Sequence, residues 1–267
     1  MNLESFFHSV AVSMEVPAAY GLFHLMLVVI GFSSCGFLAW KLRNAGEKTV
    51  NWILFACGMS LALSEVFKQF FYYYVIADGA YHWGEFPFQL CSTPMYMCLI
   101  VPFLKEGKLR RALYSFMVLY NLLGGAISFA EPSGLFHDYV FLTAHSCGWH
   151  MLLVFVGLLI CFAKLGGTSV IDYLAATKLF VTLCVVAFAL NCLVQFGLGE
   201  SMNMFFVGPG NSPLAVFKQF SEWFGWYINT PIYIASLCLG AYLIFALIYV
   251  CNHKQLPVKR KQKALKS

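Results

Sequence analysis

Long apolar stretches alternate with short polar connections along almost the whole chain. A helix rises 1.5 Å per residue, so about 20 apolar residues cross a hydrocarbon layer roughly 30 Å thick. Seven stretches suit that length, near 18–40, 50–77, 86–104, 111–130, 140–163, 172–198 and 225–251. Backbone polar groups must be satisfied within lipid, and the alternating pattern of barrel strands is absent. The pattern therefore predicts an all-α membrane protein, a bundle of seven transmembrane helices.

The composition supports the same class of protein. Of the 267 residues, 60% are hydrophobic and only 11% are charged, about half the charged share of a soluble domain. This excludes a soluble globular enzyme, and it excludes a nucleic-acid partner despite the net charge of +5. We expect membrane lipids as partners, while the oligomeric state stays open. The ten cysteines lie in or at the ends of predicted spans, so no disulfide framework is implied.

The positions of the basic residues predict the orientation of the bundle. If seven helices alternate, fifteen of the 17 Lys and Arg residues fall on one side of the membrane, which the positive-inside rule makes the cytoplasmic side. These residues are Lys41, Arg43, Lys48, Lys105, Lys108, Arg110, Arg111, Lys164, Lys178, Lys254, Lys259, Arg260, Lys261, Lys263 and Lys266. The N-terminus is then outside and the C-terminus cytoplasmic.

This orientation divides the chain into three parts. Residues 1–17 form an outer interfacial segment, 18–251 the seven-helix domain and 252–267 a basic cytoplasmic tail. No secretory signal peptide is evident at the start. We expect a multi-pass protein of the bacterial cytoplasmic membrane or of a eukaryotic endomembrane. In the longest connection, 199–224, the spacing of Phe217, Phe220 and Phe224 predicts a short interfacial helix, either a lid or a plain surface loop.

Polar residues inside the spans gather in one half of the membrane. Glu65 and Lys68 share a helix face at i, i+3 and can pair, either for structural neutralisation or for a role in binding a substrate head group or moving a proton. The other members of the group are Cys91, His145, His150, Asn191 and Gln195. Ionisable residues in a span raise a functional hypothesis. We therefore expect a cavity open to the outer leaflet, although neutral polar residues also join helices.

The third span contains the most reactive candidate. Pro87 suits the first position of its helix and Pro94 predicts a kink. Cys91 follows Gln89 near the expected helix N-terminus, where the helix dipole favours a thiolate. Such a cysteine can equally be a packing residue, and His150 in the fifth span can equally be a hydrogen-bonded one.

The chain resembles the YwaF family of bacterial integral membrane proteins and its animal relatives. The likeness is carried by YGLFHLMLV, LSEVFKQF, FPFQLCS, WHMLLVFVGLLI and, more weakly, MNMFFVGPG with FGWYI. One animal relative is described as a cysteine-dependent acyltransferase that makes polyunsaturated ether phospholipids. The resemblance implies that Cys91 is a nucleophile and His150 its base, although the animal protein has a His where Ser92 follows here. We expect the substrate to be bound by His24, Glu65, Lys68, Gln89, His145, Asn191, Asn203 and Trp226.

Two other functions stay open. A non-enzymatic transporter or receptor-like bundle that binds a small ligand or lipid would use the Glu65–Lys68 pair and tolerate loss of Cys91. A membrane cytochrome would need facing histidines on two helices, and His24, His145 and His150 are the only candidates within spans. A metal site would need further ligands beside His150. We therefore expect no cofactor and no metal.

Overall fold

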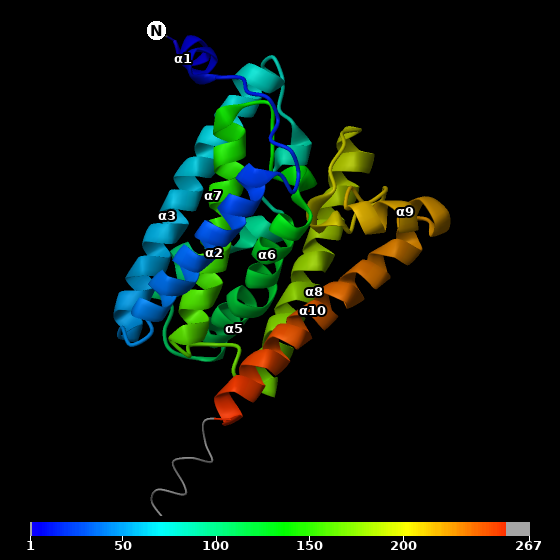
Figure 1. Cartoon of the computed structure of the whole chain (residues 1–267). Coiled ribbons are helices and arrows are strands. Elements are labelled where there is room, and N and C mark those ends of the chain that lie inside the picture. The colour runs from blue at the N-terminus through cyan, green and yellow to red at the C-terminus, as the bar shows by residue number, and fades with distance from the viewer. Residues whose placement is uncertain (1, 255–267) are drawn as a thin grey trace, which may run out of the picture.

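The computed structural model of the chain describes residues 2–254, so most of the basic tail expected at 252–267 lies outside the described residues. The described chain is helical, and its only β pairing is an isolated bridge between Ser13 and Tyr139. The helices form a bundle whose long members run side by side (Figure 1). The all-α expectation is therefore confirmed.

Six helices are long and apolar enough to cross a membrane. They coincide with six of the seven expected spans to within a few residues. They are α2 (Leu22–Lys41), α3 (Glu47–Phe71) with its π-helical end Tyr72–Ile76, α5 (Lys108–Phe116) joined through the π-helical Met117–Asn121 to α6 (Leu122–Ala130), α7 (Val140–Phe162), α8 (Val170–Cys192) with Leu193–Leu198, and α10 (Trp226–Lys254).

The seventh expected span, 86–104, is not a full-length helix. Its helical part runs only from Leu90 to Phe103, or roughly 21 Å at 1.5 Å per residue. It consists of a 3₁₀ turn (Leu90–Ser92), α4 (Thr93–Ile100) and a second 3₁₀ turn (Val101–Phe103). The prediction for Pro87 was wrong, because this residue lies before the helix rather than at its first position. Pro94 lies in the first turn of α4, where its missing N–H would have no partner within α4, and the kink at Pro94 stays a prediction.

Close approaches between helices pack the bundle around this short segment. At Gly58 of α3 a Cβ would lie 3.0 Å from the Leu99 backbone nitrogen, so α4 touches α3. At Gly157 of α7 a Cβ would lie 2.6 Å from the Leu122 Cβ. The core also contains a stack in which the Tyr120 ring lies 4.5 Å from that of Phe180. Glycine allows the first two approaches because it has no side chain to displace its neighbour.

The bundle also has two short helices, α1 (Leu3–Val10) at the top of Figure 1 and α9 (Ala215–Phe224) at its right, beside the start of α10. In α1 the buried Phe7 ring packs 4.9 Å from the ring of Phe67 on α3. The short helix predicted from the spacing of the phenylalanines in this segment is confirmed, and it is α9. It is followed by Gly225, whose φ of +81° reverses the chain into α10.

Candidate functional site at the start of the short helix

The segment from Gln89 to Thr93 is fixed by the helices on two of its sides. From α7, the Trp149 Nε1–H donates to the Cys91 carbonyl at 2.8 Å. From the π turn before α6, the Asn121 amide donates to the Leu90 carbonyl at 3.1 Å and to the Thr93 hydroxyl at 3.0 Å. These bonds satisfy backbone and side-chain groups that an interrupted helix leaves exposed inside a bundle.

The third side is closed by the loop between α8 and α9. The Gln89 amide donates to the Asn203 carbonyl at 3.1 Å and accepts from the Phe205 N–H at 2.7 Å. Asn191 on α8 holds the same loop through both backbone groups of Met204, at 2.6 and 3.0 Å. Phe205 and Phe206 both have a φ of +54°, a strained conformation for residues other than glycine. The loop is thus held in an unfavourable backbone conformation against the segment of Cys91.

The hydrogen bonds of His150 fix its tautomer. Its Nδ1 lies 2.8 Å from the Ser146 carbonyl oxygen. A carbonyl oxygen only accepts, so Nδ1 carries the proton and Nε2 carries the lone pair. Trp149, the neighbouring residue on α7, holds the Cys91 backbone. One helix therefore supplies both the imidazole and the anchor of the segment that carries the thiol.

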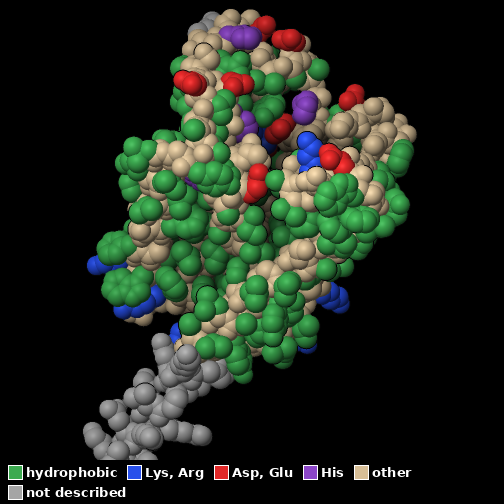
Figure 2. Space-filling view, turned by 45° about the vertical axis from the view of Figure 1, so that its right-hand side comes forward, with side chains coloured by type: hydrophobic (Ala, Val, Ile, Leu, Met, Phe, Trp, Pro, Cys, Tyr) green, Lys and Arg blue, Asp and Glu red, His purple; other side chains and the backbone are tan. Residues whose placement is uncertain are grey.

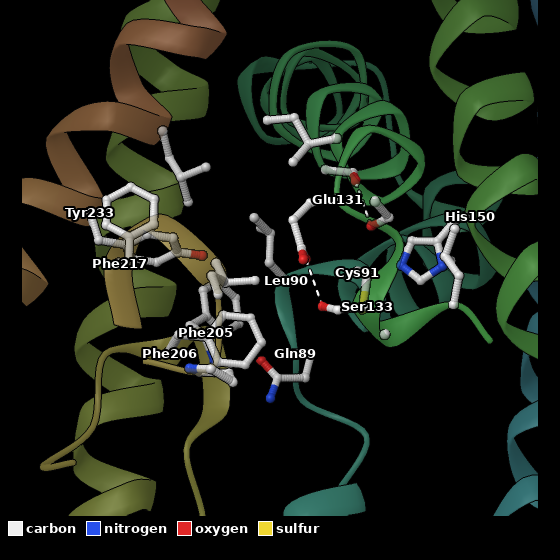
Figure 3. A pocket seen from close by; sticks show the side chains of 18 residues that line it. Gln89, Leu90, Cys91, Glu131, Ser133, His150, Phe205, Phe206, Phe217 and Tyr233 are labelled. Atoms are coloured by element: carbon white, nitrogen blue, oxygen red, sulfur yellow. Dashed lines mark hydrogen bonds between the residues drawn. The ribbon is translucent and has the colours of Figure 1, made fainter. Parts of the chain in front are cut away.

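Two cavities of about 350 Å³ each meet at Cys91 and His150, which line both of them. Figure 3 shows the two side chains next to each other, Cys91 from the short segment and His150 from α7. The other residues common to both cavities are Gln89, Gly134 and Phe206. Cys91, His150 and Gln89, which the sequence put forward as site residues, therefore lie on the walls of the same two cavities, and their roles stay a prediction.

The first cavity, called the polar cavity below, has charged side chains on its wall. The Lys68 ammonium lies 3.1 Å from a Glu65 carboxylate oxygen and 3.2 Å from one of Glu85. The Glu65–Lys68 pairing expected from the sequence is confirmed, and Glu85 is added to it. His137 lines the same cavity, and burial lowers its pKa, so it is uncharged at neutral pH. His145, also on this wall, lies with its Nδ1 2.7 Å from the Ser64 hydroxyl.

The second cavity is mostly apolar and lies between α6, α9 and α10. Figure 3 places Phe217 and Tyr233 across it from Cys91 and His150. Near Cys91 it has a polar edge, where the Ser133 hydroxyl donates to the Glu131 carboxylate at 2.8 Å. Figure 2 shows the surface hollowed between the main bundle and the lobe built by α9 and the start of α10.

Four of the expected substrate-binding residues lie on neither cavity wall. Asn191 and Asn203 hold the α8–α9 loop. Trp226 packs beside Phe188, with ring centroids 6.1 Å apart. His24 is 2% exposed and accepts the Tyr20 N–H at 3.0 Å. Its ring lies edge to face with the Phe136 ring, with centroids 5.4 Å apart, and its buried Nε2 has no hydrogen-bond partner among the described residues.

Sequence reasoning missed several residues that the structure brings to the site. Glu85 and His137 lie in connections outside the predicted spans and were not singled out, yet both line the polar cavity. Trp149 and Asn121 fix the Cys91 segment although neither was singled out. Within residues 2–254 the ten cysteines are unpaired, and no group of three or more His, Cys, Asp or Glu residues is arranged to hold a metal ion.

The comparisons with known proteins give one assignment. A model described as the TMEM164 family matches residues 19–249, from the start of α2 almost to the end of α10. The chain belongs to the TMEM164 family. With six apolar helices of membrane-spanning length, it is a multi-pass integral membrane protein that sits in lipid. No curated protein and no solved structure matches the chain. The grouping with the YwaF family stays an expectation.

Proposed function

We propose that this member of the TMEM164 family is a phospholipid acyltransferase or transacylase that works through an acyl thioester on Cys91. The observation that carries the proposal is the position of Cys91 and His150 at the junction of a polar and an apolar cavity. A phospholipid has the same division, because its ester bond joins a polar head region to an apolar chain. The proposed reaction would take place at that bond.

The two half-reactions need one nucleophile and one base. The Cys91 sulfur attacks the ester carbonyl carbon while its proton passes to His150 Nε2. The carbon–oxygen ester bond breaks, and the leaving oxygen takes that proton to give a lysophospholipid. An acceptor hydroxyl then gives its proton to His150, attacks the thioester carbon and releases the Cys91 sulfur, which recovers the proton. The bond from His150 Nδ1–H to the Ser146 carbonyl supports this role because it leaves Nε2 free as a base.

We also propose seven membrane passes, with the N-terminus outside. The helix Leu90–Phe103 would be the third pass, completed by the non-helical residues 86–89 inside the protein. Such a break is tolerated in a membrane where neighbouring elements satisfy the backbone. On the face shown in Figure 2, acidic side chains gather at the upper end and basic side chains lie chiefly at the lower end, which supports the proposed orientation.

Intact mass spectrometry of the purified protein after incubation with phospholipid tests the catalytic proposal. We expect one hydroxylamine-labile acyl group, absent in Cys91→Ala and slowed at least about 100-fold in His150→Gln. Cys98→Ala is the matched control, because Cys98 lies on the same short helix but is fully buried away from both cavities, and it should keep the adduct. A wild-type protein that binds phospholipid yet forms no adduct would contradict the proposal.

The same measurement distinguishes the alternative of a non-enzymatic lipid-binding bundle or transporter. The observation that favours this alternative is the Glu65–Lys68–Glu85 group on the wall of a cavity. It predicts lipid binding that is lost in Glu65→Gln and unchanged in Cys91→Ala. The acyltransferase predicts that Cys91→Ala binds phospholipid but transfers nothing.

A further inference from the structure

The walls of the two cavities differ in the kind of group that they can hold. The polar cavity has an ammonium and two carboxylates on its walls, those of Lys68, Glu65 and Glu85. The apolar cavity is lined away from the nucleophile by aromatic and aliphatic side chains, such as Phe217, Tyr233 and Leu237. Buried charges disfavour a hydrocarbon chain beside them, whereas an apolar wall gains free energy for each methylene that it removes from water.

The apolar cavity has a closed end along α10. Phe217 and Tyr233 pack edge to face there, with ring centroids 5.0 Å apart. Leu237 lies one helical turn beyond Tyr233 and is the last residue of α10 on the wall. At Gly240, less than a turn further, a Cβ would lie only 2.7 Å from the Leu123 Cδ2 atom of α6. The two helices are therefore in contact at that point, and no space continues between them.

We propose that the acyl chain of the Cys91 thioester lies in the apolar cavity and that Leu237 limits its length. The polar cavity then holds the head group of the alcohol half of the lipid, and this half can leave and be replaced while the acyl group stays bound. This inference rests on the proposed thioester chemistry and adds the residue that determines specificity. A closed wall discriminates between acyl chains of different length, because each methylene group that does not fit in the cavity lowers kcat/KM by a factor of about ten or more.

A competition experiment tests the assignment directly. The protein is incubated with an equimolar mixture of phospholipids that share one head group and differ only in acyl-chain length, and the mass of the Cys91 adduct identifies the chain. Leu237→Trp should lower the ratio of long to short adducts about tenfold or more, and Leu237→Ala should raise it. Leu239→Trp is the matched control, because Leu239 lies on the same helix but is 59% exposed away from the cavity, and it should leave the ratio unchanged.

Each outcome decides between the two proposals. If wild-type protein forms no adduct with any lipid, the thioester chemistry itself is wrong and this inference falls with it. If adducts form but both Leu237 variants give the wild-type ratio, only the assignment of Leu237 is overturned. If Leu237→Trp forms no adduct at all, Leu237→Ala decides, because a shift to longer chains supports the proposal and an unchanged ratio contradicts it.

Discussion

Two regions of the bundle each place a buried acidic residue beside a basic one, and the surroundings of the two ion pairs differ. In the first turn of α8, Asp172 binds Arg111 on α5 through two bonds of 2.5 and 2.9 Å. Its carboxylate also accepts the N–H groups of Thr168 and Ser169, both at 3.0 Å. In the polar cavity, Lys68 meets Glu65 and Glu85 at 3.1 and 3.2 Å.

The difference lies in what surrounds each pair. Asp172 is part of a capping box with Ser169 at the start of α8, and its hydrogen-bonding capacity is used within the protein. Neither Asp172 nor Arg111 lines either cavity. The Lys68 ammonium has three N–H groups and only two carboxylate partners among the described residues, and it faces a cavity. The first pair joins helices, whereas the second has capacity left for a ligand.

Loss of the Asp172 carboxylate should have the largest effect on stability. Asp172→Ala removes the capping box and the bonds to Arg111, which should lower the free energy of unfolding by about 2–3 kcal/mol. Tryptophan fluorescence during heating should show a midpoint roughly 4–12 °C lower. Glu106→Ala, which removes an exposed carboxylate from the nearby connection, should change the free energy by less than about 0.5 kcal/mol. If the Asp172→Ala protein is still folded but no longer forms the Cys91 adduct, a purely structural role for Asp172 is contradicted.

Changes to the charged group of the polar cavity should separate stability from activity. Lys68→Met leaves the buried Glu65 carboxylate without its cation and should cost about 1–2 kcal/mol. Glu65→Gln combined with Lys68→Met removes both charges and should recover most of that loss. Both proteins should form the Cys91 adduct at least about tenfold more slowly, because the polar cavity no longer binds the head region. A double variant with wild-type rate would show that this cavity is not the head-group site.

The smallest effect is expected at His24, which the sequence placed in the site and the structure places outside both cavities. His24→Phe keeps an aromatic ring against Phe136 and gives up only the hydrogen bond from the Tyr20 N–H. We expect less than about 1 kcal/mol in the free energy of unfolding and an unchanged rate of adduct formation. If the folded His24→Phe protein forms the adduct more than about tenfold more slowly than wild type, His24 does contribute to the site.

The sequence predicted those parts of the molecule that depend on neighbours along the chain. Six long apolar helices lie within a few residues of their expected places, because the length of an apolar run and its polar ends are local properties. The Glu65–Lys68 pair was predictable for the same reason, since residues three apart share a helix face. The helix α9 followed from its phenylalanine spacing.

The sequence could not predict which of the polar residues within the spans face a common space. His24, Asn191 and His150 are all polar residues on apolar helices, and hydropathy does not distinguish them. Only the packing shows that His150 lines the cavities while Asn191 holds a loop and His24 faces Phe136. The rotation of each helix depends on contacts with residues far away in the chain.

By itself, then, the sequence determined a multi-pass helical bundle, the positions of its long helices and a cysteine near a helix start. Only the tertiary structure decided that the helix of Cys91 begins late, at Leu90, because the bonds that replace its first turns come from Trp149, Asn121 and the α8–α9 loop. It also decided that Glu85 joins Lys68 and that two unlike cavities meet at Cys91. These features depend on residues that are distant in the chain and come together only when the helices pack.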